Sequence, residues 1–195
     1  MNKNRFNFVL ATAAAGILMM PAGAALASPS APPAPAAGAG TALAEFQGRT
    51  IDLAKGWEGA KSCTVNGPAD IECFATTAEA DKKAGYNRKT DTLAVQAEAK
   101  GLAAAADLPS CAERYLCLYE HDKGGGRRLQ FANEYWQNLD DYGFANTMSS
   151  WRNNSSNDQG SVFDNGGKGQ LNISGKTYSS NIGTFWNDTA DQVYG

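Results

Sequence analysis

The side chains that could do acid–base or nucleophilic chemistry are few in this chain. His121 is the single histidine of 195 residues and directly follows Glu120. A catalytic histidine must lie within hydrogen-bond reach of a nucleophile that it activates, whereas His121 follows a short apolar run as an ordinary polar residue would. Glu120 with Asp140 or Asp141 could imitate the carboxylate pair of a glycosidase, but acids are common in turns and nothing predicts a cleft. We therefore expect a protein that is not an enzyme.

The four cysteines are the second chemical feature. In an exported protein an even count indicates disulfides, and the spacings here are far from the paired C-x-x-C of zinc sites. Four cysteines allow three pairings. We favour Cys63–Cys73 and Cys111–Cys117, because these pairs close the shortest loops. Each disulfide would contribute about 2–3 kcal/mol of stability on the chain-entropy model.

The N-terminus indicates export. Lys3 and Arg5 precede an apolar run that ends at Met20, and Ala25-Leu26-Ala27 has the small-x-small pattern of a signal peptidase site. Residues 1–27 are therefore predicted to be a secretory signal peptide. The apolar run is shorter than the roughly 20 residues that a membrane-spanning helix needs. We expect a soluble, secreted, extracellular protein with no membrane partner.

The charge pattern argues against nucleic acid as a partner. The formal net charge is −3, and neither sign forms a run. Binding to phosphates normally needs a basic stripe. Arg127-Arg128 is the only adjacent pair of arginines, and we expect it on a solvated strand face.

Composition divides the region before residue 108 into three segments. Residues 28–43 are an Ala/Pro-rich linker without large apolar groups to bury. Residues 44–76 are predicted to form a hairpin clasped by a disulfide, with a turn at Asn66-Gly67-Pro68. Residues 77–107 are predicted to be a helical connector in two pieces or one bent helix, because Gly85 and Asn87 interrupt an Ala-rich pattern. Thr76 and Glu79 have the spacing of a capping box, and the thin apolar stripe suggests weak docking.

Residues 108–195 have the pattern of a β domain. Short β-prone runs alternate with clusters of Gly, Asn and Ser, which is typical of a sandwich or barrel. The segment also repeats. Leu118-Tyr119-Glu120 and the glycines after it are echoed by Val162-Phe163-Asp164 and a second glycine group. Each half of about forty residues could not bury both faces of its strands alone, so two halves packed together are expected to share one core.

The glycine fold at Gly124-Gly125-Gly126 and the serine turn at residues 146–151 resemble the two-part signature of a βγ-crystallin Greek key. Cys111 to Glu120 resembles the opening of the secreted, crystallin-like peptidase inhibitors of actinobacteria. A module like residues 46–82 often precedes the domain in such proteins. The resemblance implies a mainly β fold, a βγ-crystallin-like sandwich of two Greek keys, preceded by the disulfide hairpin and the helical connector.

For function, the resemblance implies a non-enzymatic peptidase inhibitor, of the metalloproteinase-inhibitor type, whose partner is an extracellular protease. We expect it to act as a monomer that occludes the protease with a surface loop. The characterised inhibitors of the family are implied to clasp that loop with a second disulfide in the β domain. In this chain no cysteine follows Cys117, so the loop is not clasped in that way.

Crystallin-type domains also bind calcium through paired polar turns, which supply the oxygen ligands that calcium prefers. No cofactor is required for the inhibitor function, and calcium is the one ligand that the resemblance adds. The alternative to a site is that these side chains satisfy backbone groups of a folded hairpin. The candidate ligands are Asn146, Thr147 and Ser149 in the first turn and Asn187, Asp188 and Asp191 in the second.

Two further functions remain as alternatives to inhibition. One is a calcium-binding or structural protein of the cell exterior. The other is a glycan-binding or toxin-like module, in which Tyr135, Trp136, Trp151 and Trp186 would form a carbohydrate platform. Such aromatics more often fill a core or cover its ends.

Overall fold

The computed structural model describes residues 40–101, 107–156 and 159–195. All of the described residues belong to a single compact body. The predicted signal peptide and most of the linker therefore lie outside the described residues. Within those residues, no helix has the length and apolar character that a membrane crossing demands.

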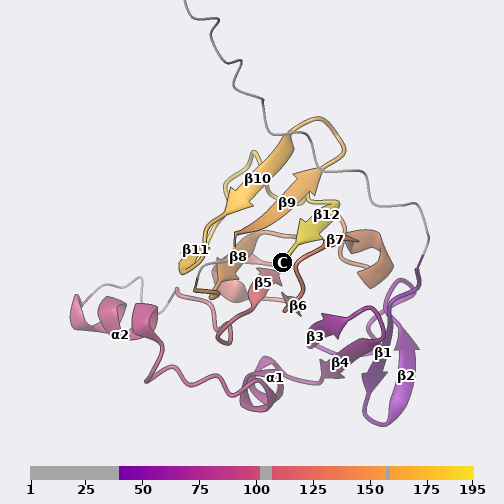
Figure 1. The fold of residues 1–195 in the computed structure, drawn as a ribbon, viewed down its shortest axis with the longest axis horizontal. Coiled ribbons are helices and arrows are strands. Elements are labelled where there is room, and N and C mark those ends of the chain that lie inside the picture. The colour runs from indigo at the N-terminus through magenta and orange to yellow at the C-terminus, as the bar shows by residue number, and fades with distance from the viewer. Residues whose placement is uncertain (1–39, 102–106, 157–158) are drawn as a thin grey trace, which may run out of the picture. The chain divides into compact units, whose positions relative to one another are not determined.

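Short strands dominate the described part of the chain (Figure 1). The N-terminal strands are β1 (Leu43–Phe46), β2 (Arg49–Asp52), β3 (Ser62–Gly67) and β4 (Asp70–Phe74). The helices α1 (Thr77–Lys83) and α2 (Thr92–Ala99) follow. The remaining strands are β5 (Leu116–Tyr119), β6 (Arg128–Phe131), β7 (Trp136–Asn138), β8 (Ser150–Asn153), β9 (Gly160–Asp164), β10 (Gly169–Ile173), β11 (Thr177–Ser179) and β12 (Gln192–Tyr194). Short 3₁₀ helices cover Asp122–Gly124 and Leu139–Tyr142.

The strands form two sheets that exchange strands between two repeated units. The order is β11-β8-β5-β6-β3-β4-β1-β2 in the larger sheet and β10-β9-β12-β7 in the smaller one. The first unit, β5 to β8, places its third strand, β7, in the sheet of the second unit. The second unit, β9 to β12, places its third strand, β11, beside β8 in return. This exchange is the arrangement of a pair of Greek keys, and it confirms the mainly β fold class.

The predicted glycine fold, Gly124-Gly125-Gly126, lies between β5 and β6. Gly126 has a φ of +72°, and a Cβ atom there would lie 2.8 Å from Cβ of Glu120. Only glycine fits both the left-handed conformation and the close approach. Glu120 accepts hydrogen bonds from the backbone N–H of Arg127 (2.9 Å) and from its guanidinium (3.1 Å). Burial opposes the charge of Glu120, but these bonds outweigh it and hold the pKa of the carboxyl below its usual value.

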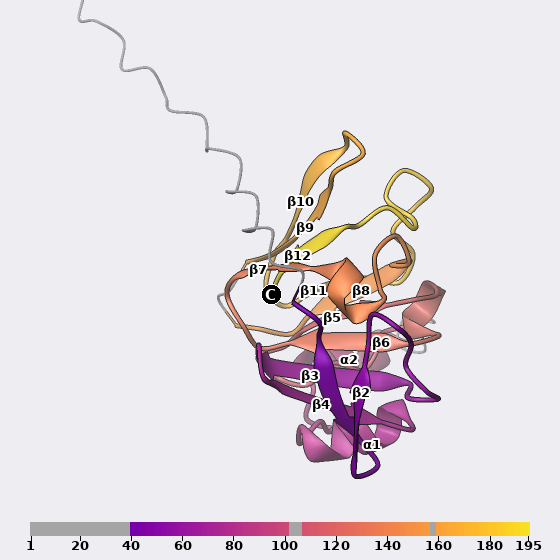
Figure 2. The same cartoon turned by 90° about the vertical axis from the view of Figure 1, so that its right-hand side faces the viewer.

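The N-terminal segment is part of the larger sheet and does not form a lone hairpin. Residues 43–74 make two hairpins, β1–β2 and β3–β4, and β3 continues the sheet by pairing in parallel with β6. Cys63 and Cys73 face each other on β3 and β4 and form a disulfide, and Cys111–Cys117 is the other. This is the pairing favoured from the sequence. Figure 2 shows β3 and β4 following β6 in the same sheet.

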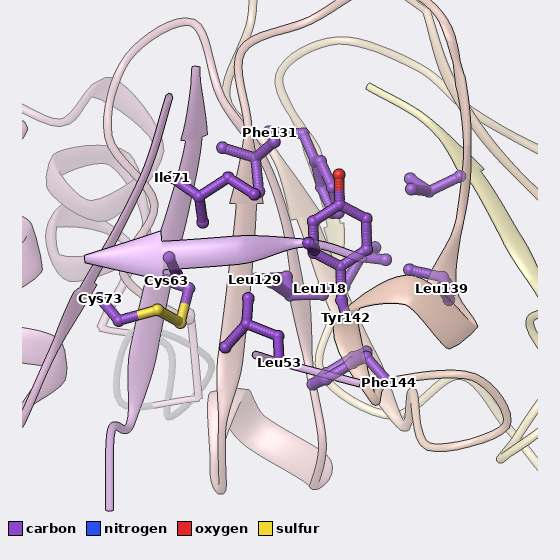
Figure 3. Packing of buried hydrophobic residues seen from close by; sticks show 14 of the residues in the cluster. Leu53, Cys63, Ile71, Cys73, Leu118, Leu129, Phe131, Leu139, Tyr142 and Phe144 are labelled. Carbon is purple, nitrogen blue, oxygen red and sulfur yellow. A yellow bond between two sulfur atoms is a disulfide. The ribbon is translucent and has the colours of Figure 1, made fainter. Parts of the chain in front are cut away.

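One apolar core joins the N-terminal hairpins to the sandwich. Figure 3 shows Leu53 and the Cys63–Cys73 disulfide beside Leu118, Leu129 and Phe144. The Nε1–H of Trp57 donates a 2.8 Å hydrogen bond to the carbonyl of Tyr142, which lies 85 residues later. These contacts show that residues 43–74 complete the core of the β domain.

The two helices dock through buried ion pairs, which the thin apolar stripe did not predict. The capping box of Thr76 and Glu79 begins α1, and the carboxylate of Asp91 caps α2. Asp81 of α1 binds Arg128 at 2.6 Å, and Asp91 binds Arg152 at 2.7 Å. Both arginines are fully buried. The expectation that Arg128 lies on a solvated face was therefore wrong.

The pairing with Arg152 changes the acidity of Asp91. Burial opposes ionisation of its carboxyl group, but the hydrogen bond and the positive charge of Arg152 outweigh burial. The pKa of Asp91 is therefore held below its ordinary value. Arg152 also donates to the carbonyl of Pro109 at 2.8 Å, so this one side chain ties β8 to both the second helix and the segment that follows it.

Candidate functional site

The two turns predicted from the repeat lie against each other. Asn146 and Asp188 occupy equivalent places, and both have a φ of +54°, in the left-handed region. The N–H of Asn146 donates to the carbonyl of Ala190 (2.8 Å), and the N–H of Asp188 donates to that of Met148 (3.1 Å). The reciprocal bonds make the turns a symmetric pair that joins the two units.

One side of the turn pair brings oxygen atoms of three residues together. The hydroxyl of Ser149 donates to the carbonyl of Glu120 at 2.8 Å and lies 3.5 Å from Oδ1 of Asp188. A carbonyl, a hydroxyl and a carboxylate are the kinds of ligand that calcium takes. Since residues from two turns and one strand supply them, only the folded domain can assemble the group.

On the other side of the turn pair, the carboxylate oxygens already have hydrogen-bond donors. Asp191 accepts one hydrogen bond from the side-chain amide of Asn146 (3.0 Å) and one from the backbone N–H of Asn165 (2.7 Å). Both carboxylate oxygens thus already have N–H donors, and the bond from Asn165 satisfies a backbone group as described above.

The other predicted ligands are also engaged within the turns. Thr147 donates to the carbonyl of Phe144 at 2.6 Å, and the amide of Asn187 donates to Asp188 at 2.6 Å. In the part of the chain that the structure describes, no cluster of three or more His, Cys, Asp and Glu residues could hold a metal ion. Calcium binding at the two turns therefore stays a prediction.

A loop beside these turns presents an aromatic side chain that the sequence analysis did not single out. Phe185 is 63% exposed, the most exposed of the large apolar side chains among the described residues. Its ring lies 5.9 Å from that of Trp186, and the ammonium group of Lys168 lies 5.4 Å from its centroid. The signal that could have found it is the glycine–aromatic sequence of residues 183–186, placed between two polar turns.

The loop, residues 180–188, is fastened at both ends to the first unit. At its start the carbonyl of Ser180 accepts from the N–H of Lys123 (2.7 Å), and the N–H of Ile182 donates to the carbonyl of Ser149 (3.0 Å). At its other end Asp188 donates to Met148, as described above. Backbone hydrogen bonds therefore restrain this loop at both ends.

Inside the loop the backbone forms a helical turn. The N–H groups of Trp186 and Asn187 both donate to the carbonyl of Gly183, at 3.2 and 3.0 Å. The amide of Asn181 donates to the carboxylate of Asp122 (2.7 Å), and its oxygen accepts from the N–H of Gly183 (2.7 Å). Phe185 thus projects from a compact turn and not from an extended segment.

A polar hollow of about 420 Å³ borders the loop. Its lining includes Asp122 from the first unit and Asn181, Thr184 and Asn187 from the loop. The candidate site as a whole therefore consists of the exposed ring of Phe185, the hollow beside it and the paired turns. All three lie on neighbouring segments. His121 precedes Asp122 but is exposed, and the carbonyl of His121 accepts a hydrogen bond from Ser150.

The four aromatic residues considered as a carbohydrate platform do not lie together. Trp151 and Trp186 are half-buried and pack against the apolar core. Trp136 instead lies on the smaller sheet, next to Phe163 and Tyr194. The four residues therefore do not form one platform, and Trp151 and Trp186 have the core-covering role that such aromatics more often take.

Comparison with known proteins gives one family match. Residues 104–170 match the model of peptidase inhibitor family I36, a region that includes β5 to β9 and begins at residues outside the described part. The match covers less than half of the chain and stops before the loop of Phe185. A search of the curated proteins finds no match.

Solved structures similar to this chain include βγ-crystallins. A βγ-crystallin from Ciona intestinalis is 24% identical over 41% of this chain and 96% of its own, with a TM-score of 0.34. A structure described as showing the evolution of the eye lens βγ-crystallin domain fold is 17% identical over 43% of this chain and 86% of its own, with a TM-score of 0.38. A βγ-crystallin domain mutant from Clostridium beijerinckii is 17% identical over 41% and 93%, with a TM-score of 0.34. We rest the fold on the strand exchange and not on these scores.

Proposed function

We propose that this chain is a secreted peptidase inhibitor that occludes an extracellular protease and catalyses no reaction itself. The match of residues 104–170 to peptidase inhibitor family I36 carries the proposal. The two disulfides support it, because such bonds persist in oxidising compartments outside the cytosol. The protein acts as a monomer in this proposal, and metalloproteinases are the first targets to test.

The loop of Phe185 is the proposed contact. An inhibitor loop must be rigid, because ordering a flexible loop on binding weakens the complex. Here the hydrogen bonds to Lys123, Ser149 and Met148 supply the restraint. An exposed aromatic residue can fill an apolar pocket of the partner, as the anchor residues of interfaces commonly do.

The helical turn around Phe185 sets the manner of inhibition. A peptide bond that is to be cut must enter a protease cleft in extended form, whereas the turn closed on Gly183 is compact. We infer that Phe185 plugs the cleft without presenting its own peptide bond for cleavage. The inhibitor would therefore stay intact after long incubation with its target.

Replacing Phe185 with alanine is expected to weaken inhibition by about thirtyfold or more, since central aromatic anchors contribute about 2 kcal/mol or more to binding. The measurement is the inhibition constant of the secreted chain, residues 28–195, against a panel of metalloproteinases and serine proteases. Val95→Ala is the matched control, because Val95 on α2 is also an exposed apolar residue at 44%. Undiminished activity of every protease at micromolar inhibitor would end the proposal. If Phe185→Ala and Val95→Ala inhibit equally well, the contact with the protease lies on another surface.

Calcium binding is the second candidate function, and the convergence of Ser149, Asp188 and the Glu120 carbonyl favours it. If the ion binds there, calcium at 100 times its dissociation constant stabilises the fold by about 2.7 kcal/mol. Asp188→Asn is expected to abolish this shift, and Asp140→Asn, in a 3₁₀ helix elsewhere, to leave it unchanged. Melting curves with calcium and with chelator test both. Identical curves for the unchanged chain would remove this candidate.

A further inference from the structure

The outer face of the smaller sheet is composed of two rows of residues fixed by strand register. One row runs through cross-strand neighbours on β10, β9, β12 and β7 as Asn172, Ser161, Tyr194 and Trp136. The next row on the same face is Gln170, Phe163, Gln192 and Asn138. The row between them, Leu171, Val162, Val193 and Gln137, points to the core because successive side chains alternate across a sheet.

These eight residues contain no Asp, Glu, Lys or Arg, although charged residues are about a fifth of the chain at 19%. Four are amides, three are aromatic and one is serine. An anionic or cationic partner would meet no opposite charge on this face. The complementary partner is uncharged, rich in hydroxyl groups and flat enough to lie on aromatic rings.

The aromatic residues form one cluster. The ring centroid of Trp136 lies 5.8 Å from that of Tyr194 and 6.4 Å from that of Phe163. All three residues are half-buried, so none is sealed in the core. A pyranose ring has a face of C–H groups that can pack on such a surface with good dispersion contact.

The polar residues of the face are held in place by one another. Gln170 donates to Asn172 (2.6 Å) and to the hydroxyl of Ser161 (3.0 Å), which in turn donates to Asn172 at 3.1 Å. Gln192 donates to Asn165 at 3.3 Å. Amides fixed in this way offer hydrogen bonds to a ligand without first losing side-chain entropy, so they favour a partner with many hydroxyl groups.

A pocket of about 200 Å³ adjoins the aromatic cluster at β7. Trp136 and Asn138 belong both to the face and to the pocket lining, which also includes Tyr135, Gln137 and Asp141. Gln137 is only 6% exposed, and its Nε2 is a buried donor without a hydrogen-bond partner in the described part of the chain. Gln137 pairs with Val193 in the core-facing row and accepts a hydrogen bond from Tyr142, so this amide lies beneath the face and is not offered to a ligand.

We propose that this face and the adjoining pocket bind a neutral polysaccharide, with sugar rings packed on Trp136, Tyr194 and Phe163. The exposed amides of β10, Gln170 and Asn172, hydrogen-bond the hydroxyl groups, and the pocket takes one sugar unit at the β7 side. The site is separate from the loop of Phe185 in sequence and in strand membership. Its role does not depend on protease inhibition, and the two activities can be lost independently.

The test is binding of the secreted chain, residues 28–195, to insoluble cellulose and insoluble chitin, together with fluorescence titration with cellohexaose and chitohexaose. We expect binding to at least one of these glycans and a loss of about tenfold or more in Trp136→Ala. Gln170→Ala, which leaves the aromatic cluster untouched, is expected to weaken binding less. Because the face is uncharged, the dissociation constant is expected to change by less than about twofold between low and high salt.

Phe185→Ala is the matched control, since it removes an exposed aromatic residue elsewhere, and it is expected to bind glycan as the unchanged chain does. A melting curve for each variant shows that it is folded. Absence of binding to all four glycans, or equal binding by Trp136→Ala, would overturn the proposal. So would sedimentation showing a dimer that Trp136→Ala converts to a monomer, because the face would then be covered by a second copy of the chain.

Discussion

Asp91→Asn is expected to lower the free energy of unfolding by about 3–5 kcal/mol, because it leaves the fully buried Arg152 without its counter-ion. Asparagine still caps a helix, so the loss reports the ion pair and not the cap of α2. The measurement is urea unfolding of residues 28–195 at neutral pH. The matched control is Glu58→Gln, which breaks the exposed pair with Arg49 and is expected to change stability by about 0–1 kcal/mol.

A double variant separates charge burial from packing. Asp91→Asn combined with Arg152→Met removes the stranded charge, so it is expected to recover much of the stability that the single variant loses. An apolar residue of similar length also removes the Nε–H of Arg152, which has no partner in the described residues. If Asp91→Asn alone is as stable as Glu58→Gln, the ion pair does not hold the second helix.

The same pair predicts a pH dependence. The pKa of Asp91 is lower in the folded protein than in the unfolded chain, where an aspartate titrates near about 3.9. The stabilisation from this shift is therefore present above that pH and is lost as the pH falls through the folded pKa. The difference in stability between the unchanged chain and Asp91→Asn is expected to shrink below about pH 4. A difference that stays constant down to that range would contradict this assignment.

Residues 108–195 expressed alone are expected not to unfold cooperatively, although they contain both repeated units. Without the preceding segment β6 loses its parallel partner β3, and Arg128 and Arg152 lose Asp81 and Asp91. Each stranded buried charge costs about 3–5 kcal/mol, against a total stability of about 5–15 kcal/mol for a domain. Leu53 and Trp57 are also missing from the core.

Near-ultraviolet circular dichroism and denaturant titration of the fragment test this expectation. A longer fragment, residues 41–195, is the matched control, because it keeps the hairpins and both helices and is expected to unfold like the secreted chain. Both are measured under oxidising conditions, so that the Cys111–Cys117 disulfide is intact in each. A cooperative transition of similar midpoint in the two fragments would show that the β domain is autonomous.

The local features of the fold could be predicted from the sequence. The disulfide pairing followed from short loops, the capping box from Thr76 and Glu79, and the repeated units from the glycine groups. Each of these signals involves residues that are near one another in the chain or recur at a fixed interval. The two turns around Asn146 and Asp188 were expected from the family resemblance, and the structure shows them paired.

The long-range features could not be predicted. The parallel pairing of β3 with β6 joins residues 66 apart, and Arg128 finds its partner Asp81 47 residues away. Nothing in the neighbourhood of Arg128 distinguishes a buried arginine from a solvated one, so its burial was missed. The uncharged face of the smaller sheet depends on the register of four strands, and only the structure shows which side chains share it.

The attachment of β3 to β6 has a consequence for the behaviour of the protein at high concentration. Strands at the margin of a sheet offer unpaired backbone groups to other molecules and can start aggregation. Without β3, that margin would be β6, whose four residues are all buried and include Leu129 and Phe131. In the folded chain the margin moves to β2, which is four residues long and carries Arg49 and Asp52. The N-terminal hairpins thus replace an apolar sheet edge with a short, charged one, which disfavours edge-to-edge aggregation.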